Sequence, residues 1–211
     1  MQRDRGRDQP KMKPATAALL SQAADHHKRG ALEKAEQLYR RVLKASPGNP
    51  DALHLSGVVA HQVGRHHRAA QLITKAIRQD GGQAVFHTNL AGVYIALGEW
   101  DDAEAACRAA IALRDDDPKP YHALGEALEG RGDFGGAAEA LESGLLLEPA
   151  NAAVRVRLAS IRARSGNLVG AIAALEETLE REPSHVQAMS ELAAYLTSAG
   201  RADDGEGYAR R

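Results

Sequence analysis

Apolar side chains recur three and four residues apart in paired segments along the chain. In residues 84–117 the first stripe ends at Gly98 and consists of Leu90, Val93, Tyr94 and Leu97. The second stripe consists of Trp100, Ala103, Ala106, Cys107, Ala110 and Ile111. Both spacings are typical of amphipathic helices, and a glycine permits the positive φ angle that ends a helix. The pattern therefore predicts a helix, a tight turn and a second helix.

This pattern repeats every 34 residues without an insertion. A small residue is followed seven positions later by a glycine in six copies, with the small residues at Ala23, Gly57, Ala91, Gly125, Ala159 and Ala193 and the glycines at Gly30, Gly64, Gly98, Gly132, Gly166 and Gly200. A fixed period of this length indicates stacked repeats that bury their apolar faces on their neighbours. We therefore expect one elongated domain with a single core.

The period defines the predicted boundaries. The copies span 16–49, 50–83, 84–117, 118–151 and 152–185, with an incomplete copy at 186–211, and residues 1–15 are charged and contain proline, which predicts a disordered arm. Pro47, Pro149 and Pro183 close three copies, because proline cannot continue a helix. In the sixth copy Gly205 replaces the expected alanine, and we expect a short frayed helix or a cut end.

The positions where the paired helices cross are small. Ala35, Ala69, Ala103, Ala137 and Ala171 stand where each second helix presses against the first. In the fifth copy, however, Arg155 and Arg162 replace bulky apolar residues on the packing face. We expect this copy to be the loosest of the internal ones.

Composition excludes several classes of protein. Cys107 is the one cysteine, so an intramolecular disulfide is impossible, and its place on the packing face predicts a small core residue rather than a redox group. No run of about 18 apolar residues is present, so we expect no membrane insertion and a cytoplasmic location. Motifs for phosphate loops, nucleophile elbows and dinucleotide binding are also missing, which predicts a non-enzyme without a cofactor.

Histidine is frequent, with nine residues in the chain. His61, His66 and His67 lie around one predicted turn, but no acidic or cysteine ligand shares their spacing. Because a metal site needs three or four converging ligands, we predict no metal site.

Charge is divided unevenly along the chain. Residues 1–83 hold 15 Lys and Arg against 7 Asp and Glu, residues 84–151 hold 4 against 13, and residues 152–211 hold 8 of each. The acidic middle disfavours nucleic acid as a partner. Salt-sensitive head-to-tail self-association is a possibility, with Asp115, Asp116, Asp117, Glu99, Asp101 and Asp102 meeting Arg40, Arg41, Lys44, Arg65 and Arg68. The alternative is that these are ordinary solvated faces.

These residues resemble the tetratricopeptide repeat (TPR) family. The fourth copy carries its pattern of large, small, turn and closing residues in Tyr121, Leu124, Gly125, Leu128, Gly132, Ala137, Leu141 and Pro149. The resemblance implies an all-α fold, an α-solenoid of antiparallel helix pairs in a right-handed superhelix, with the first helix of each pair lining a concave groove. The style of the repeats is similar to bacterial repeat arms that precede transferase domains.

The groove-facing residues are the candidate binding site. They are His54, Val58, His61, Thr88, Asn89, Ile95, Lys119, His122, Glu126, Arg157, Ser160 and Arg164. A bound peptide would meet apolar contacts first and ion pairs later. Alternatively, Glu126 and Glu129 simply neutralise Arg157 and Arg164 between adjacent repeats.

Two family functions can be compared with these positions. The carboxylate clamp of TPR co-chaperones requires Lys, Asn, Asn, Lys and Arg, whereas the corresponding residues here are His54, Val58, Asn89, Lys119 and Ala123. The asparagine ladder of O-GlcNAc transferase arms is represented by Asn89 alone. We therefore predict a non-catalytic scaffold that binds a protein or peptide partner in its groove. The alternative is the substrate-recruiting arm of a larger transferase, of the O-GlcNAc-transferase or sulfotransferase type.

Overall fold

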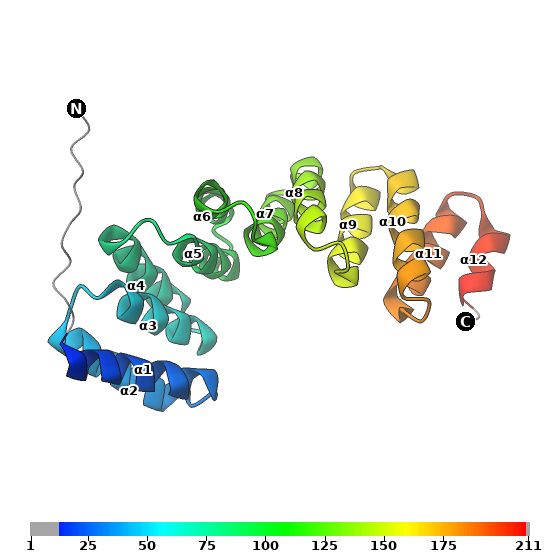
Figure 1. Cartoon of the computed structure of the whole chain (residues 1–211). Coiled ribbons are helices and arrows are strands. Elements are labelled where there is room, and N and C mark those ends of the chain that lie inside the picture. Colours follow the sequence, from blue (N-terminus) through cyan, green and yellow to red (C-terminus); the bar gives the residue numbers. More distant parts are fainter. Residues whose placement is uncertain (1–12, 210–211) are drawn as a thin grey trace. The chain divides into compact units, whose positions relative to one another are not determined.

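The computed structural model describes residues 13–209, which form twelve α-helices and no strand. The helices belong to two compact units that divide between Gly81 and Gly82. The first unit holds α1 (Pro14–Lys28), α2 (Leu32–Ala45), α3 (Pro50–Gln62) and α4 (His66–Gln79). Within it α1 packs on α2 and α3 packs on α4 as neighbouring antiparallel pairs (Figure 1).

The second unit continues the same arrangement. It holds α5 (Ala84–Leu97), α6 (Trp100–Leu113), α7 (Pro118–Arg131), α8 (Phe134–Leu147), α9 (Ala152–Arg164), α10 (Leu168–Arg181), α11 (Val186–Ser198) and α12 (Ala202–Ala209). Each odd-numbered helix packs on the even-numbered helix that follows it, and α6, α8 and α10 also contact the next pair. The predicted helix pairs and the all-α solenoid are thus confirmed.

Side chains and glycines fix the helix ends. Asn49, Asp117, Asp133, Asn151 and Asn167 each accept a hydrogen bond from a main-chain N–H of the helix that follows, which satisfies a donor left free at the helix start. The predicted turn glycines all have positive φ angles, between 73° and 85°. Because L-residues with side chains rarely adopt this conformation, glycine at these places turns the chain between the helices of a pair.

The helix pairs cross at the small residues. Ala35, Ala69, Ala103, Ala137 and Ala171 are completely buried. At Gly125 an added Cβ would lie 2.6 Å from Cδ2 of Leu141, so α7 and α8 touch there without space for a side chain. The core of each unit is formed by Ala, Leu, Ile and Val around these crossings. Cys107, with no exposed surface, belongs to this core as predicted, and burial raises the pKa of its thiol to about 12.

The ends of the repeat array differ in detail from the prediction. Helix α1 begins at Pro14, two residues inside the predicted arm, and residues 1–12 lie outside the described residues. The last helix, α12, has eight residues and buries Gly205 against α11. An added Cβ at Gly205 would lie 2.9 Å from the carbonyl oxygen of Ala193, which explains why glycine replaces alanine in this copy.

Arg155 and Arg162, the two departures in the fifth copy, have well-defined partners. Arg155 is 3% exposed and donates a hydrogen bond to the carbonyl oxygen of Pro149. Arg162 donates to the carbonyl oxygen of Gly170 over 3.0 Å. The expectation that this copy is the loosest stays a prediction, since these bonds compensate part of the missing apolar contact.

Candidate functional site

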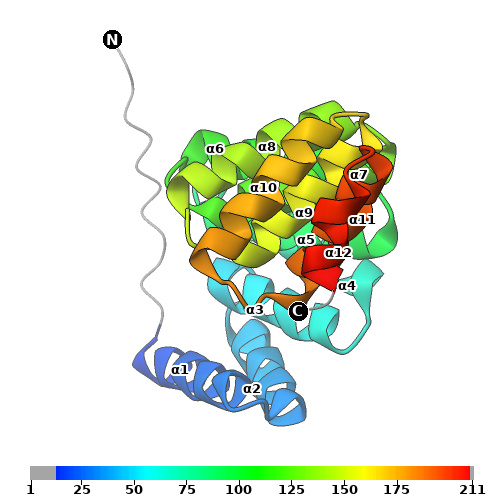
Figure 2. The ribbon, with the colours of Figure 1, turned by 90° about the vertical axis from the view of Figure 1, so that its right-hand side faces the viewer.

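The second unit has two layers of helices. The first helices α5, α7, α9 and α11 lie on one side, and the second helices α6, α8 and α10 lie on the other (Figure 2). In the first-helix layer α5 contacts α7 and α9 contacts α11. This layer carries the candidate groove residues of the second unit.

An ion-pair network joins α7 to α9 in this layer. The Arg157 guanidinium lies 2.8 Å from one carboxylate oxygen of Glu129 and 3.4 Å from one of Glu126. Burial lowers the pKa of Arg157, but the hydrogen bonds and charges of the two glutamates outweigh this effect and the net shift is upward. The charge neutralisation considered as the alternative for these residues is therefore present.

Arg164 extends the network at the end of α9. It pairs with the second carboxylate oxygen of Glu129, and its guanidinium lies 4.3 Å from the ring centre of Phe134. A cation over an aromatic face gains a further electrostatic attraction. Its side chain is still about half exposed, so a ligand has access to it.

A polar cluster continues this surface from α9 to α11. The side chain of Tyr195 is close to Ser160 and Glu191, and its pKa is raised, mainly by burial and by the negative charge of Glu191. Oε1 of Glu191 accepts a hydrogen bond from Gln187, whereas the buried Oε2 atom has no partner. A buried acceptor without a donor is costly, so Glu191 is a polar group that is incompletely satisfied within this layer.

The remaining candidates of the second unit are less available. Thr88 donates its hydroxyl proton to the carbonyl oxygen of Ala84 within its own helix. His122 lies against Gly144, where an added Cβ would meet its ring at 2.6 Å, and burial lowers its pKa. Asn89 and Ile95 are partly buried, and Lys119 is exposed at the start of α7.

Three candidates belong to the first unit, and one of them is placed differently from the expectation. His54 is 6% exposed, so it lies in the core rather than on an open groove. Burial, with a smaller contribution from the charge of His27, lowers its pKa to about 4. Val58 and His61 are partly buried. His54 was expected on the groove because helical periodicity gives the direction of a side chain. It does not show how deeply a neighbouring helix buries that side chain.

Two other side-chain contacts of the first unit involve histidines. Nδ1 of His61 lies 3.0 Å from Nδ1 of His66, with the ring centres 4.8 Å apart, and Nε2 of His27 lies 2.8 Å from Oε1 of Gln62. Within residues 13–209 no three His, Cys, Asp or Glu residues converge as a metal site would require. In the same part of the chain, no helix combines the length and apolar character needed to cross a membrane.

Some of the charges considered for self-association already have partners. Arg65 lies 2.7 Å from Glu36, and Asp101 lies 3.1 Å from Arg131. The pKa of Glu36 is lowered, and the side-chain hydrogen bond with Arg65 is the largest cause. Head-to-tail association stays a prediction, and these internal pairs reduce the charge that is available for it.

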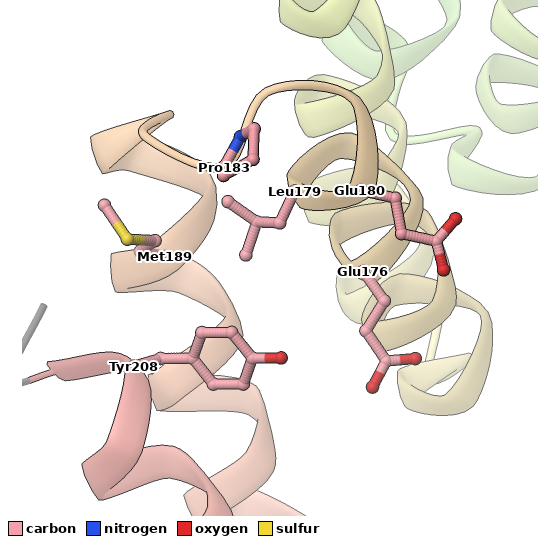
Figure 3. A pocket seen from close by; sticks show the side chains of 6 residues that line it. All are labelled: Glu176, Leu179, Glu180, Pro183, Met189 and Tyr208. Atoms are coloured by element: carbon pink, nitrogen blue, oxygen red, sulfur yellow. The ribbon is translucent and has the colours of Figure 1, made fainter.

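The sequence did not indicate the hollows of the second unit. One, of about 300 Å³, lies between α10, α11 and α12 (Figure 3). Tyr208 points across it from α12 toward α10, which carries Glu176 and Glu180, and Leu179 and Pro183 lie at its other end. Larger hollows lie among the second helices, between α6 and α8 and between α8 and α10. Their walls come from residues in different copies, so a pattern within one copy could not reveal them.

Comparison with protein families agrees with this geometry. A tetratricopeptide repeat model matches residues 60–128 and 128–194, and a second one matches residues 5–50. The chain belongs to the tetratricopeptide repeat family. The resemblance noted in the sequence is thereby confirmed over more than half of the chain.

The similarity to individual proteins is weaker than the match to the family. This TPR chain is 31% identical over 112 residues to the Hsp70-Hsp90 organizing protein of Triticum aestivum, a match that covers 53% of the chain and 19% of the wheat protein. Among solved structures it is similar to MamA of Desulfovibrio magneticus RS-1, with a TM-score of 0.76 and 18% identity over 82% of this chain and 98% of that one. PilF of Pseudomonas aeruginosa gives a TM-score of 0.77 and 18% identity over 92% and 88% of the two chains. At these identities the structural similarity concerns the fold.

Proposed function

We propose that this protein is a non-catalytic adaptor that holds an extended, acidic segment of a partner protein along α7, α9 and α11. Membership of the TPR family and the sequence relationship to Hsp70-Hsp90 organizing proteins support a role in protein–protein interaction. The specific site is suggested by the first-helix layer of the second unit, where partly exposed ion pairs join consecutive repeats.

The single observation that supports this best is the partial exposure of the arginines. The side chains of Arg157 and Arg164 are 37% and 51% exposed while they share Glu129. Arg157 also contacts Glu126, but the two guanidiniums still leave donors for further acceptors, since each guanidinium has five N–H groups. A carboxylate of the partner would bind these donors.

A chaperone-type carboxylate clamp is not the mechanism that we propose. The relevant positions include His54 and Val58 where the clamp has Lys and Asn, and His54 is buried and has a pKa near 4. A neutral, buried imidazole does not attract a carboxylate as an exposed ammonium does. The partner segment is therefore recognised by Arg157 and Arg164 on α9.

Charge variants of opposite expected effect test the proposal. A binding partner is isolated from an extract of the source cells, and its affinity for the purified chain is measured by calorimetry. The double variant Arg157→Ala/Arg164→Ala should bind at least tenfold more weakly. The double variant Glu126→Gln/Glu129→Gln should bind more tightly, because it releases both arginines from internal competition.

A matched control separates this effect from a general loss of charge. Arg108 lies on α6 in the second-helix layer and pairs with Glu104 one turn away, so Arg108→Ala removes an ion pair without touching the site. Its affinity should equal that of the unaltered chain, and circular dichroism checks that all variants are folded. If both double variants lose affinity equally, or neither changes it, the arginines only connect α7 to α9 and the proposal is wrong.

A further inference from the structure

A hollow that the proposed groove does not use opens between helices of the two layers. It lies between α8, α9 and α10 and has a volume of about 470 Å³. Its walls are apolar at Leu145, Leu146, Pro149, Leu158 and Ala174 and carry the charged side chains of Arg155, Arg162, Glu142 and Glu177. This volume falls within the roughly 300–1,000 Å³ of typical ligand sites, which combine apolar walls with a few polar groups. We call it the α8–α10 hollow.

Its two arginines are the residues that depart from the repeat pattern. The side chain of Arg155 is only 4% exposed, and its Nε atom lies 3.4 Å from Oε1 of Glu177. Arg162 is held by a 2.8 Å ion pair to Glu142 and by the carbonyl oxygen of Gly170. Placing a guanidinium in an apolar wall is costly, because it loses water on most sides. The bonds to Pro149, Glu177, Glu142 and Gly170 offset part of this cost, and a negatively charged group in the hollow would offset more of it.

Positive charge exceeds negative charge in this ion-pair network. Glu177 is shared between Arg155 and Arg181, the latter at 3.1 Å, and Glu142 pairs with Arg162. Two arginines and two glutamates line the hollow, and with Arg181 beside it three guanidiniums are paired with two carboxylates, which leaves one positive charge in the network. Both glutamate side chains are about half exposed, so they can turn aside for a competing carboxylate.

The rim of the hollow is apolar and uncovered. Leu146 is 82% exposed, and together with Val169 it is the most exposed of the large apolar residues in the described part of the chain. Beneath it Leu158 and Ala174 are buried, so an apolar group that lies on Leu146 would extend an existing core. A single exposed leucine is common on protein surfaces, but here it borders a cavity with a buried arginine.

We propose that the α8–α10 hollow binds a partner protein through a segment that carries one aspartate or glutamate beside a large aliphatic residue. The carboxylate accepts hydrogen bonds from Arg155 and Arg162, and the aliphatic side chain covers Leu146 and contacts Leu158. A charge and an apolar anchor within one short segment match the single excess charge and the adjoining apolar rim. This interaction is additional to binding along α7, α9 and α11, because its walls come from α8, α10 and residues of α9 other than Arg157 and Arg164.

Labelled peptides test this site directly. The probes are a panel of eight-residue, blocked peptides in which one Glu or Asp is flanked by Leu, Ile or Phe, and binding is followed by fluorescence anisotropy with the full chain. At least one acidic peptide should bind, and its Gln or Asn counterpart should bind at least tenfold more weakly. Leu146→Glu should weaken binding by a similar factor, because it removes the apolar rim and repels the carboxylate.

Two further variants keep the test independent of folding. Leu147 neighbours Leu146 on α8 and is 42% exposed but does not line the hollow, so Leu147→Glu should leave binding unchanged. Arg162→Gln tests the charge while the more deeply buried Arg155 is kept. Arg157→Ala/Arg164→Ala should not affect these peptides, which distinguishes this site from the proposed groove.

Three results would overturn the inference. They are no binding by any acidic peptide at millimolar concentration, equal binding by the acidic and amide peptides, and equal loss in Leu146→Glu and Leu147→Glu. Sodium octanoate serves as a probe for a free apolar carboxylate. If octanoate shifts the amide resonances of Arg155 and Leu158 while no peptide binds, the hollow receives a small molecule and the proposed protein segment is wrong.

Discussion

The contact between α7 and α8 permits a quantitative prediction about Gly125. A Cβ at this position would lie 2.6 Å from Cδ2 and 2.8 Å from Cγ of Leu141, and 3.4 Å from the carbonyl oxygen of Ala137. Leu141 is 1% exposed, so its side chain has little room to move. A substitution here therefore forces the two helices apart or moves the branch point of a core leucine.

Two opposing effects determine the cost of Gly125→Ala. Removal of a glycine from a helix interior stabilises by about 0.5–1 kcal/mol, whereas overpacking of a core costs about 1–3 kcal/mol. We expect a net loss of about 1–2 kcal/mol for Gly125→Ala. Gly125→Leu should lose about 3 kcal/mol or more, because its additional carbons have no space at all.

Gly92 supplies the matched control. It also lies inside a first helix, α5, but an added Cβ would meet no atom within 4 Å. Gly92→Ala should therefore stabilise by about 0.5–1 kcal/mol, opposite in sign to Gly125→Ala. In a chain of this size 1 kcal/mol corresponds to roughly 2–4 °C in the melting temperature followed by circular dichroism. An unchanged melting curve for Gly125→Leu, or equal stabilisation by both alanine variants, would refute the assigned crossing point.

The remaining predictions concern protonation, thiol reactivity and assembly. The folded pKa of His54, about 4, lies below the roughly 6.5 of an unfolded chain, so stability of the first unit is complete above about pH 6.5 and is lost as the pH falls toward 4. The loss should be about 2 kcal/mol at pH 5, measured by hydrogen exchange in α3, and the dependence should largely vanish in His54→Leu; an identical dependence in both proteins would exclude this histidine as the cause. Cys107 should react with a thiol reagent only after unfolding, because burial raises its pKa to about 12, and rapid labelling of the folded chain would contradict its place in the core. Head-to-tail association should be visible by sedimentation near 0.01 M salt, where the Debye length is about 30 Å, and should disappear toward about 0.5 M; a monomer at high concentration in low salt would rule it out.

Local rules are sufficient to predict most of the fold. The 34-residue period located every helix pair, because the turn glycines and small crossing residues recur where the backbone requires them. The boundary of α1 was missed by two residues, since Pro14 is acceptable in the first turn of a helix and does not mark its outside. Gly205 could not be explained from the sequence either. Glycine is needed there because the helix approaches the backbone at Ala193 closely, and only the folded helix pair creates this contact.

The candidate site was less predictable than the fold. The periodicity brought Glu126, Arg157 and Arg164 to one layer, and the structure joins them through Glu129. It could not indicate the depth of a neighbouring helix, which buries His54, nor the contribution of Tyr195 and Phe134. Such features depend on distances between copies, whereas a sequence period describes only what the copies have in common.

The turn positions require glycine because of their positive φ angle and not because space for a side chain is missing. Gly132 has a φ angle of 84°, yet a Cβ in the L configuration would meet no other atom within 4 Å. A D-amino acid prefers positive φ for the same steric reason that an L-amino acid avoids it. A chain assembled by chemical ligation with D-alanine at Gly132 would therefore keep the turn and lose backbone freedom chiefly in its unfolded state. If D-amino acids were available as well as L-amino acids, this solenoid would not need glycine between its paired helices.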